Sequence, residues 1–189
     1  PLTAERFDLH IIDSYNPRFT VHVGYAYTDL SIFDANLFGI TPSEVEVMDP
    51  QQRLLLSSVY QIFYKVQQQN IKSNILTGIF VGAWASKYAN ITSIHSNSAS
   101  PFAAVGSELS VLCGRISYTY GLQGPSICTD TACSSSLVAL HIASSSVLNL
   151  ECEKALACGV SLTIGTSAHI GGSAANMLSS DGRCKTLDI

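Results

Sequence analysis

One short run of the sequence constrains the fold more than any other. Residues Leu76–Trp84 read LTGIFVGAW, a nearly uninterrupted apolar stretch bounded by polar residues. A strand of this kind has no polar face to present to water, so it must be covered on both sides, as in a parallel sheet between helices. The sequence therefore predicts a buried strand with helices packed on each face of its sheet.

The segments around this run alternate between helical and extended patterns. Asp49-Pro50 is typical of a helix start, with an N-cap residue followed by proline at the first helical position. Apolar residues then recur at helical spacing and predict an amphipathic helix to about Gln69. Further along we expect a helix over 105–120 that ends at the Gly121 turn, a strand over 126–131, a helix with an apolar face of Leu137, Leu140, His141, Ser144, Val147 and Leu148, and a strand over 154–164.

Strands and helices that alternate around one apolar body are typical of the α/β class. A chain of 189 residues is long enough to bury a sizeable core. We expect the rest of the chain to be irregular: residues 1–49, the polar segment 85–104, and the Gly- and Ser-rich end after residue 164.

Composition excludes several classes of protein. Hydrophobic residues make up 47% and charged residues only 13%, the reverse of what a disordered chain needs. The formal net charge of −4 leaves no electrostatic footprint for nucleic acid, and no apolar run approaches the roughly 18 residues of a membrane span. Neither a C-x-x-C pair nor a glycine-rich phosphate loop occurs, so no zinc site, dinucleotide or ATP is implied.

The residues between the second predicted strand and the third predicted helix carry the chemistry. Cys133 lies at this tight junction, among small neighbours that would let a substrate approach. A thiol there faces the positive end of the helix macrodipole and unpaired N–H groups, which favour the thiolate. The same N–H groups can donate to the oxygen of an acyl group attached to the sulfur. This arrangement describes a nucleophile for acyl transfer through a thioester. A lone cysteine in an α/β protein is more often a small buried apolar residue, and both interpretations stay open at this point.

The other cysteines have a simpler interpretation. Cys113, Cys128, Cys152 and Cys158 each lie in an apolar helix or strand, where a cysteine behaves as a small buried hydrophobe. Sparse, reduced cysteines are the default of an intracellular protein, and we expect this one to be cytoplasmic.

The stretch Asp130–His141, DTACSSSLVALH, resembles the active-site signature of β-ketoacyl synthases, in particular the ketosynthase domains of type I modular polyketide synthases. Other segments resemble the same family in the same order along nearly the whole chain. They are Phe33–Pro42, Met48–Leu56, Gly114–Tyr118, Gly121–Ser126 and Leu178–Lys185. Residues 1–189 thus resemble the N-terminal portion of a ketosynthase domain, without its first strand and its C-terminal half.

The resemblance implies a thiolase-like fold, in which two similar halves pack as α-β-α-β-α layers and two subunits form a homodimer. It implies that Cys133 is the nucleophile, which takes an acyl chain from the phosphopantetheine arm of an acyl carrier protein. A malonyl-type carrier thioester then loses carbon dioxide, and its carbanion attacks the Cys133 thioester in a Claisen condensation. No bound cofactor or metal is implied, because phosphopantetheine arrives as part of the substrate.

Parts of the family pattern are missing from this sequence. The family's two later catalytic histidines have no counterpart, and His141, two turns along the helix from Cys133, is expected to be a packed core residue rather than a base. Ser161–Ala168 and Leu187-Asp188 also depart from the family pattern, in a region expected near the acyl pocket. We expect the fragment alone to be inactive and poorly stable, because a lost strand leaves sheet edges open.

The sequence leaves several alternatives open. A thiolase or a stand-alone fatty-acid condensing enzyme also uses a cysteine at a helix start. The segments Asp49–Arg53 and Asp181–Lys185 instead favour the type I polyketide group, or the condensing enzyme of the animal-type fatty acid synthase, which shares them. A non-elongating ketosynthase that only binds an acyl chain is disfavoured by the intact Cys133. A purely structural, dimer-forming piece is the remaining alternative.

Overall fold

The computed structural model describes residue 30 and residues 32–68, 76–86, 88–90, 100–164 and 167–179. These residues fall into two compact units, which divide between Leu162 and Thr163. The larger unit, from Leu30 to Leu162, holds the sheet, most of the helices and Cys133.

The larger unit is built on a parallel sheet of strands β1 (Thr77–Ala83), β2 (Ser126–Thr129) and β3 (Lys154–Val160). The strand order is β2-β1-β3, and both neighbours run parallel to β1. Every residue of β1 is buried, as the apolar run in the sequence predicts. The strands β2 and β3 end earlier than expected, at residues 129 and 160 rather than 131 and 164.

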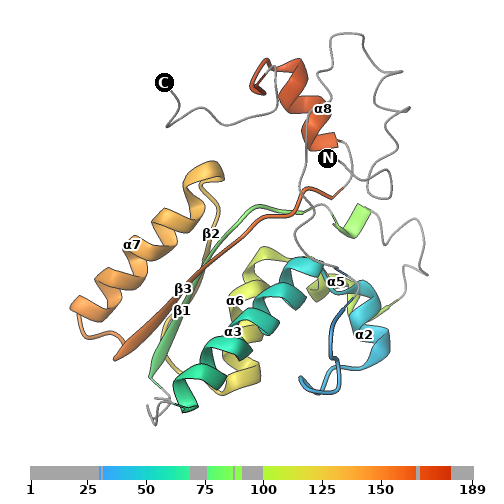
Figure 1. Cartoon of the computed structure of the whole chain (residues 1–189). Coiled ribbons are helices and arrows are strands. Elements are labelled where there is room, and N and C mark those ends of the chain that lie inside the picture. The colour runs from blue at the N-terminus through green and yellow to red at the C-terminus, as the bar shows by residue number, and fades with distance from the viewer. Residues whose placement is uncertain are drawn as a thin grey trace. The chain divides into compact units, whose positions relative to one another are not determined.

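Helices cover both faces of this sheet (Figure 1). On one face, α3 (Pro50–Gln68) packs against α6 (Leu109–Tyr120), and both contact the strands; on the other face, α7 (Ser135–Leu148) lies across β1 and β3. The Gly121 turn closes α6 in the left-handed conformation, with φ +65°. The α/β class and its helices on both sheet faces are confirmed.

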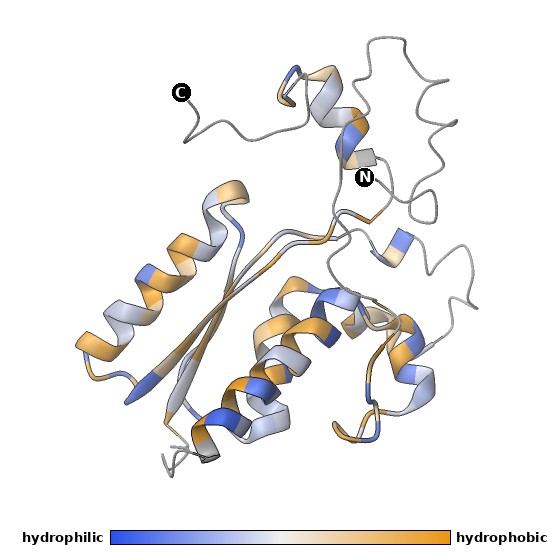
Figure 2. Ribbon diagram, viewed as in Figure 1, coloured by the Kyte–Doolittle hydropathy of each residue, from blue (hydrophilic) through white to orange (hydrophobic). Residues whose placement is uncertain are grey.

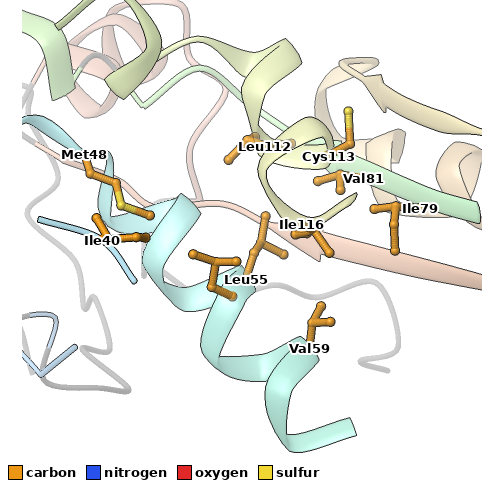
Figure 3. Close-up of a cluster of buried hydrophobic side chains, with 11 residues drawn as sticks. Ile40, Met48, Leu55, Val59, Ile79, Val81, Leu112, Cys113 and Ile116 are labelled. Atoms are coloured by element: carbon orange, nitrogen blue, oxygen red, sulfur yellow. The ribbon is translucent and has the colours of Figure 1, made fainter. Parts of the chain in front are cut away.

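The strand β1 alternates its side chains between two packing layers. Ile79 and Val81 enter the core formed with α3 and α6, which includes Leu55, Val59 and Ile116 (Figure 3). Phe80 points to the other side and packs with Ala139 and Ala143 of α7. The α3–α6 layer therefore holds most of the large core side chains, while on the α7 side Phe80 packs against small residues of the helix.

Two short helices were not expected from the sequence. Helix α2 (Pro42–Val47) has Thr41 as its N-cap residue, whose hydroxyl accepts a hydrogen bond from the Glu44 N–H. Helix α5 (Ala103–Gly106) is separate from α6, because the chain breaks its helical path at Ser107 and Glu108. The single helix expected over 105–120 is wrong in this respect.

Two further expectations need correction. The segment after residue 164 is not all irregular, because α8 (Ser167–Ala174) forms a helix in the smaller unit. Ser86, expected in a surface excursion, is buried and donates a hydrogen bond to the Asp49 carboxylate. The expectations for residues 1–29, 91–99 and 181–189 lie outside the described residues.

The apolar face assigned to the third helix is also wrong. Its large residues point away from the sheet: Leu137 is 68% exposed, Leu140 is 54% exposed and Leu148 is 79% exposed. His141 is exposed as well, so it is not the packed core residue expected. The buried face consists of Ser135, Ala139, Ala143 and Ser146, since only small residues let a helix approach a sheet so closely. Figure 2 shows hydrophobic residues recurring along the whole of α7.

We predict that the folded chain loses stability as pH rises from about 9 to about 11. Burial raises the pKa of Cys128 from 9.0 to about 11, and burial also raises the pKa of Cys158. Between these pH values the unfolded thiol has lost its proton and the native thiol keeps it, so the free energy of unfolding falls. Urea unfolding at a series of pH values should therefore show a flatter alkaline slope for Cys128→Ala than for the wild type. Equal slopes would contradict the assignment.

Candidate active site

Cys133 lies where the sequence predicts, between a strand and the helix that follows it. It is the middle residue of a single 3-10 turn, Ala132–Ser134, which joins the end of β2 to the start of α7. Its side chain is exposed, whereas Cys113 and Cys152 are buried. A substrate can therefore reach the Cys133 thiol from solvent.

Polar side chains next to Cys133 hold this turn in shape. The Ala132 N–H donates to the Asp130 Oδ1 at 3.0 Å, and the Ser134 hydroxyl donates to the Thr131 carbonyl at 2.9 Å. Asp and Ser commonly fold back on nearby backbone groups in this way. The residues that flank Cys133 in the sequence thus fix the backbone that presents it.

Ser135 binds the backbone of the turn just before Cys133. Its side chain is buried, accepts a hydrogen bond from the Thr131 N–H at 2.9 Å and donates to the Ala132 carbonyl at 2.7 Å. Sequence reasoning treated the serines only as small neighbours and missed these roles for Asp130 and Ser135. The signal that could have found them is the Asp and Ser content of a tight turn.

The residue before Cys133 has an unusual backbone. Ala132 has φ +56°, in the left-handed region that costs an L-residue about 1–2 kcal/mol. Such strain persists only where the surrounding structure enforces it, and it is enriched at functional sites. Here the Asp130 and Ser135 hydrogen bonds enforce it, on either side of Cys133.

Two glycines let α7 begin directly on the sheet. A Cβ at Gly82 of β1 would overlap the backbone carbonyl of Ser135, and a Cβ at Gly159 of β3 would lie 2.8 Å from the Ser136 Cβ. Any side chain at Gly82 would therefore displace the first turn of α7. The position of Cys133 depends on these two residues having none.

The backbone around Cys133 can also bind a negative oxygen. Among the described residues, none accepts a hydrogen bond from the Cys133 N–H, and that group lies beside the N-terminus of a 14-residue helix. An N–H without a partner at the positive end of a helix dipole can donate to the negatively charged oxygen of an acyl group bonded to the Cys133 sulfur.

The fold and this turn define a class of α/β domain that exposes a cysteine between a parallel strand and the following helix. Residues 5–188 match the family model described as "Beta-ketoacyl synthase, N-terminal domain". The chain therefore belongs to the β-ketoacyl synthase family.

Curated relatives include a hybrid PKS-NRPS synthetase and a polyketide synthase. The chain is 38% identical to Hybrid PKS-NRPS synthetase 1 of Dothistroma septosporum, a match that covers 100% of this chain and 5% of the relative. It is 37% identical to a phenolphthiocerol/phthiocerol polyketide synthase of Mycobacterium tuberculosis, over 98% of this chain and 12% of that protein. The chain thus spans only a small part of the curated relatives it matches.

Solved ketosynthase domains have the same fold. The ketosynthase from module 6 of the bacillaene synthase of Bacillus subtilis matches with a TM-score of 0.78 and 32% identity, over 99% of this chain and 31% of that one. The oxazolomycin ketosynthase domain of Streptomyces albus matches with a TM-score of 0.77 and 28% identity, over 98% of this chain and 33% of that one. The thiolase-like fold implied by the sequence is confirmed.

The described segments contain neither a metal-binding group nor a membrane-spanning helix. Those residues contain no group of three or more His, Cys, Asp or Glu side chains placed to hold a metal ion. In the same segments, no helix combines the length and the apolar character needed to cross a bilayer.

We predict that Gly82→Ala displaces the first turn of α7 and lowers the free energy of unfolding by about 1–3 kcal/mol, the usual cost of overpacking. The matched control is Gly114→Ala in α6, where a Cβ would meet nothing within 4 Å. That change should raise stability by about 0.5–1 kcal/mol, because alanine suits a helix interior better than glycine. Chemical denaturation of both variants measures the difference, and equal midpoints would contradict the close approach.

Proposed function

We propose that this chain is the nucleophile-bearing part of a polyketide synthase ketosynthase, and that Cys133 carries the growing acyl chain as a thioester. The observation that supports this most is the exposed Cys133 on a rigid turn at the N-terminus of α7. Family membership supplies the reaction class, decarboxylating Claisen condensation.

In the first step, the Cys133 thiolate attacks the carbonyl carbon of an acyl thioester. A new carbon–sulfur bond forms, negative charge moves to the carbonyl oxygen, and the Cys133 N–H donates to that oxygen. The intermediate collapses as the pantetheine thiolate leaves and takes up a proton. The acyl chain then resides on Cys133.

In the second step, a malonyl-type thioester loses carbon dioxide and becomes an enolate. Its carbon attacks the acyl carbonyl on Cys133, a carbon–carbon bond forms, and the Cys133 thiolate leaves with its electron pair. The two later histidines that the family resemblance implies for this step have no counterpart in this sequence.

We infer that an acyl carrier protein delivers both thioesters on its phosphopantetheine arm, and that the protein needs no cofactor of its own. The free state of Cys113, Cys128, Cys133, Cys152 and Cys158 supports a reducing, cytoplasmic location.

We further propose that residues 1–189 form the N-terminal portion of a domain whose remainder covers α7 and that pairs as a homodimer. The exposed leucines of α7 support this, since Leu137, Leu140 and Leu148 are otherwise an apolar stripe in water. The matched solved domains support it too, because this chain covers only 31–33% of each.

We predict that iodoacetamide alkylates Cys133 before the other described cysteines near neutral pH. Cys133 is exposed, Cys113 and Cys152 are buried, and burial raises the pKa of Cys128 to about 11. Peptide mapping after brief labelling of the complete domain gives the order. Faster labelling of Cys128 than of Cys133 would contradict the assignment.

We predict that Cys133→Ala abolishes acyl loading from an acyl carrier protein thioester, observed by intact-mass spectrometry of the complete domain. Cys128→Ala is the matched control, because it removes the half-buried thiol of β2, the strand that leads into the Cys133 turn. That variant should load at the wild-type rate. Loading that survives in Cys133→Ala would overturn the proposed function.

A further inference from the structure

A buried polar cluster lies at the start of α3. Asp49, Gln51 and Gln52 are 2%, 1% and 1% exposed, among the most buried side chains of the larger unit. A buried amide or carboxylate costs free energy unless its polar atoms have partners. Each of these side chains does have partners, and the partners differ in a way that separates their roles.

Gln51 joins the carboxyl ends of two neighbouring strands. Its Nε2 donates to the Trp84 carbonyl at 3.1 Å, and its Oε1 accepts from the Leu162 N–H at 3.1 Å. Trp84 directly follows β1, and Leu162 lies just beyond the end of β3. One side-chain amide from α3 therefore connects the two chain segments that leave the sheet.

This amide takes the place of the next rung of the sheet. Backbone pairing of β1 with β3 ends at Ala83↔Val160. If the register continued, the Trp84 carbonyl and the Leu162 N–H would be direct hydrogen-bond partners. Because the Gln51 amide offers the same donor and acceptor, it can insert between them and hold the strands apart without leaving either group unpaired.

The place where β1 and β3 separate lies next to the residues on which the helix turn after Cys133 packs. The first turn of α7 rests on Gly82 and Gly159, each immediately before the last rung of the β1–β3 pair. In open parallel sheets, ligands bind in the crevice beyond the carboxyl ends of the strands, where the sheet separates. A strand pair that closed by one more rung would change the surface beneath that turn.

We propose that Gln51 is a positioning residue for acyl transfer to Cys133: by splitting β1 from β3 at their carboxyl ends, it holds the sheet in the shape that the first turn of α7 requires. It acts through the backbone and does not touch substrate. The inference rests on the proposed function of Cys133.

Asp49 keeps Gln51 in place. Its carboxylate accepts hydrogen bonds from the Gln51 N–H at 2.8 Å and from the Ser86 hydroxyl, and its own N–H donates to the Gly106 carbonyl at 2.7 Å. The start of α3 is thereby tied to the segment that follows β1. Asp49 thus fixes the Gln51 backbone at the start of the helix, and the two strand ends hold the Gln51 side chain.

Gln52 provides a matched control within the same cluster. It is equally buried, but its Nε2 donates to Val105 and Gly106 carbonyls at 3.1 and 3.0 Å, and its Oε1 accepts from the Arg115 Nε at 2.7 Å. These partners belong to α5 and α6 and not to the strand ends. Loss of the Gln52 amide should therefore cost stability without affecting the β1–β3 opening.

The test compares Gln51→Met with Gln52→Met in the complete domain. Both changes keep side-chain length and remove a buried amide, so both should lower the denaturation midpoint. We expect Gln51→Met to slow acylation of Cys133 by an acyl-N-acetylcysteamine thioester about tenfold or more, because small misplacements of a reacting group are costly. Acylation of Gln52→Met should stay within about threefold of the wild type, and iodoacetamide alkylation of Cys133 should stay within about threefold in both variants.

Equal losses of acylation in the two variants, or wild-type acylation in Gln51→Met, would overturn the proposal. Gln51→Glu is the second variant if Gln51→Met does not fold. It keeps the acceptor for the Leu162 N–H and loses the donor to the Trp84 carbonyl, and we expect it to slow acylation as well; wild-type acylation in it would equally overturn the proposal. Failure of the proposed function would give a different result, because the Cys133→Ala variant would then be acylated at the wild-type rate.

Discussion

The close contact between the first turn of α7 and the sheet is the constraint on which the site depends. It requires Gly82 and Gly159 beneath the turn, and small residues along the face of α7 that meets the strands. It also requires the strained φ of Ala132, which hydrogen bonds from Asp130 and Ser135 maintain. Cys133 is presented to solvent because every neighbour on the sheet side is small or folded back on the backbone.

The two faces of the sheet are stabilised by different means. On the α3–α6 face, large apolar side chains supply the core, and an ion pair between Arg115 and Glu44 at 2.6 Å links α6 to α2. The buried amides of Gln51 and Gln52 satisfy backbone groups where regular pairing stops. On the α7 face the helix contributes only small buried side chains, so its backbone lies close to the sheet and Phe80 of β1 packs against it. The α3–α6 face thus holds the strand ends that lie next to the site.

The sequence predicts the parts of this structure that depend on strong local patterns. The apolar run of β1, the helix start at Asp49-Pro50 and the strand–helix junction at Cys133 are all in place. The parts that depend on long-range contacts could not be predicted. Nothing local shows that Ser86 is buried against Asp49, or that Gln51 reaches two strand ends. Helix α8 was missed because Gly171 and Gly172 argue for a loop on local grounds.

Helix α7 was predicted correctly in extent and incorrectly in orientation, for a physical reason. Hydrophobic periodicity assigns the largest residues to the core, but here Ala139 and Ala143 face the sheet and Leu140 points away from it. Small residues toward one layer and leucines toward the other are what a helix needs when it is covered on both sides. If the proposed remainder of the domain covers those leucines, the lateral faces of α7 become interior and only its N-terminus stays open. A substrate would then reach Cys133 along the helix axis, the direction in which the unpartnered N–H and the helix dipole act together on an incoming thioester.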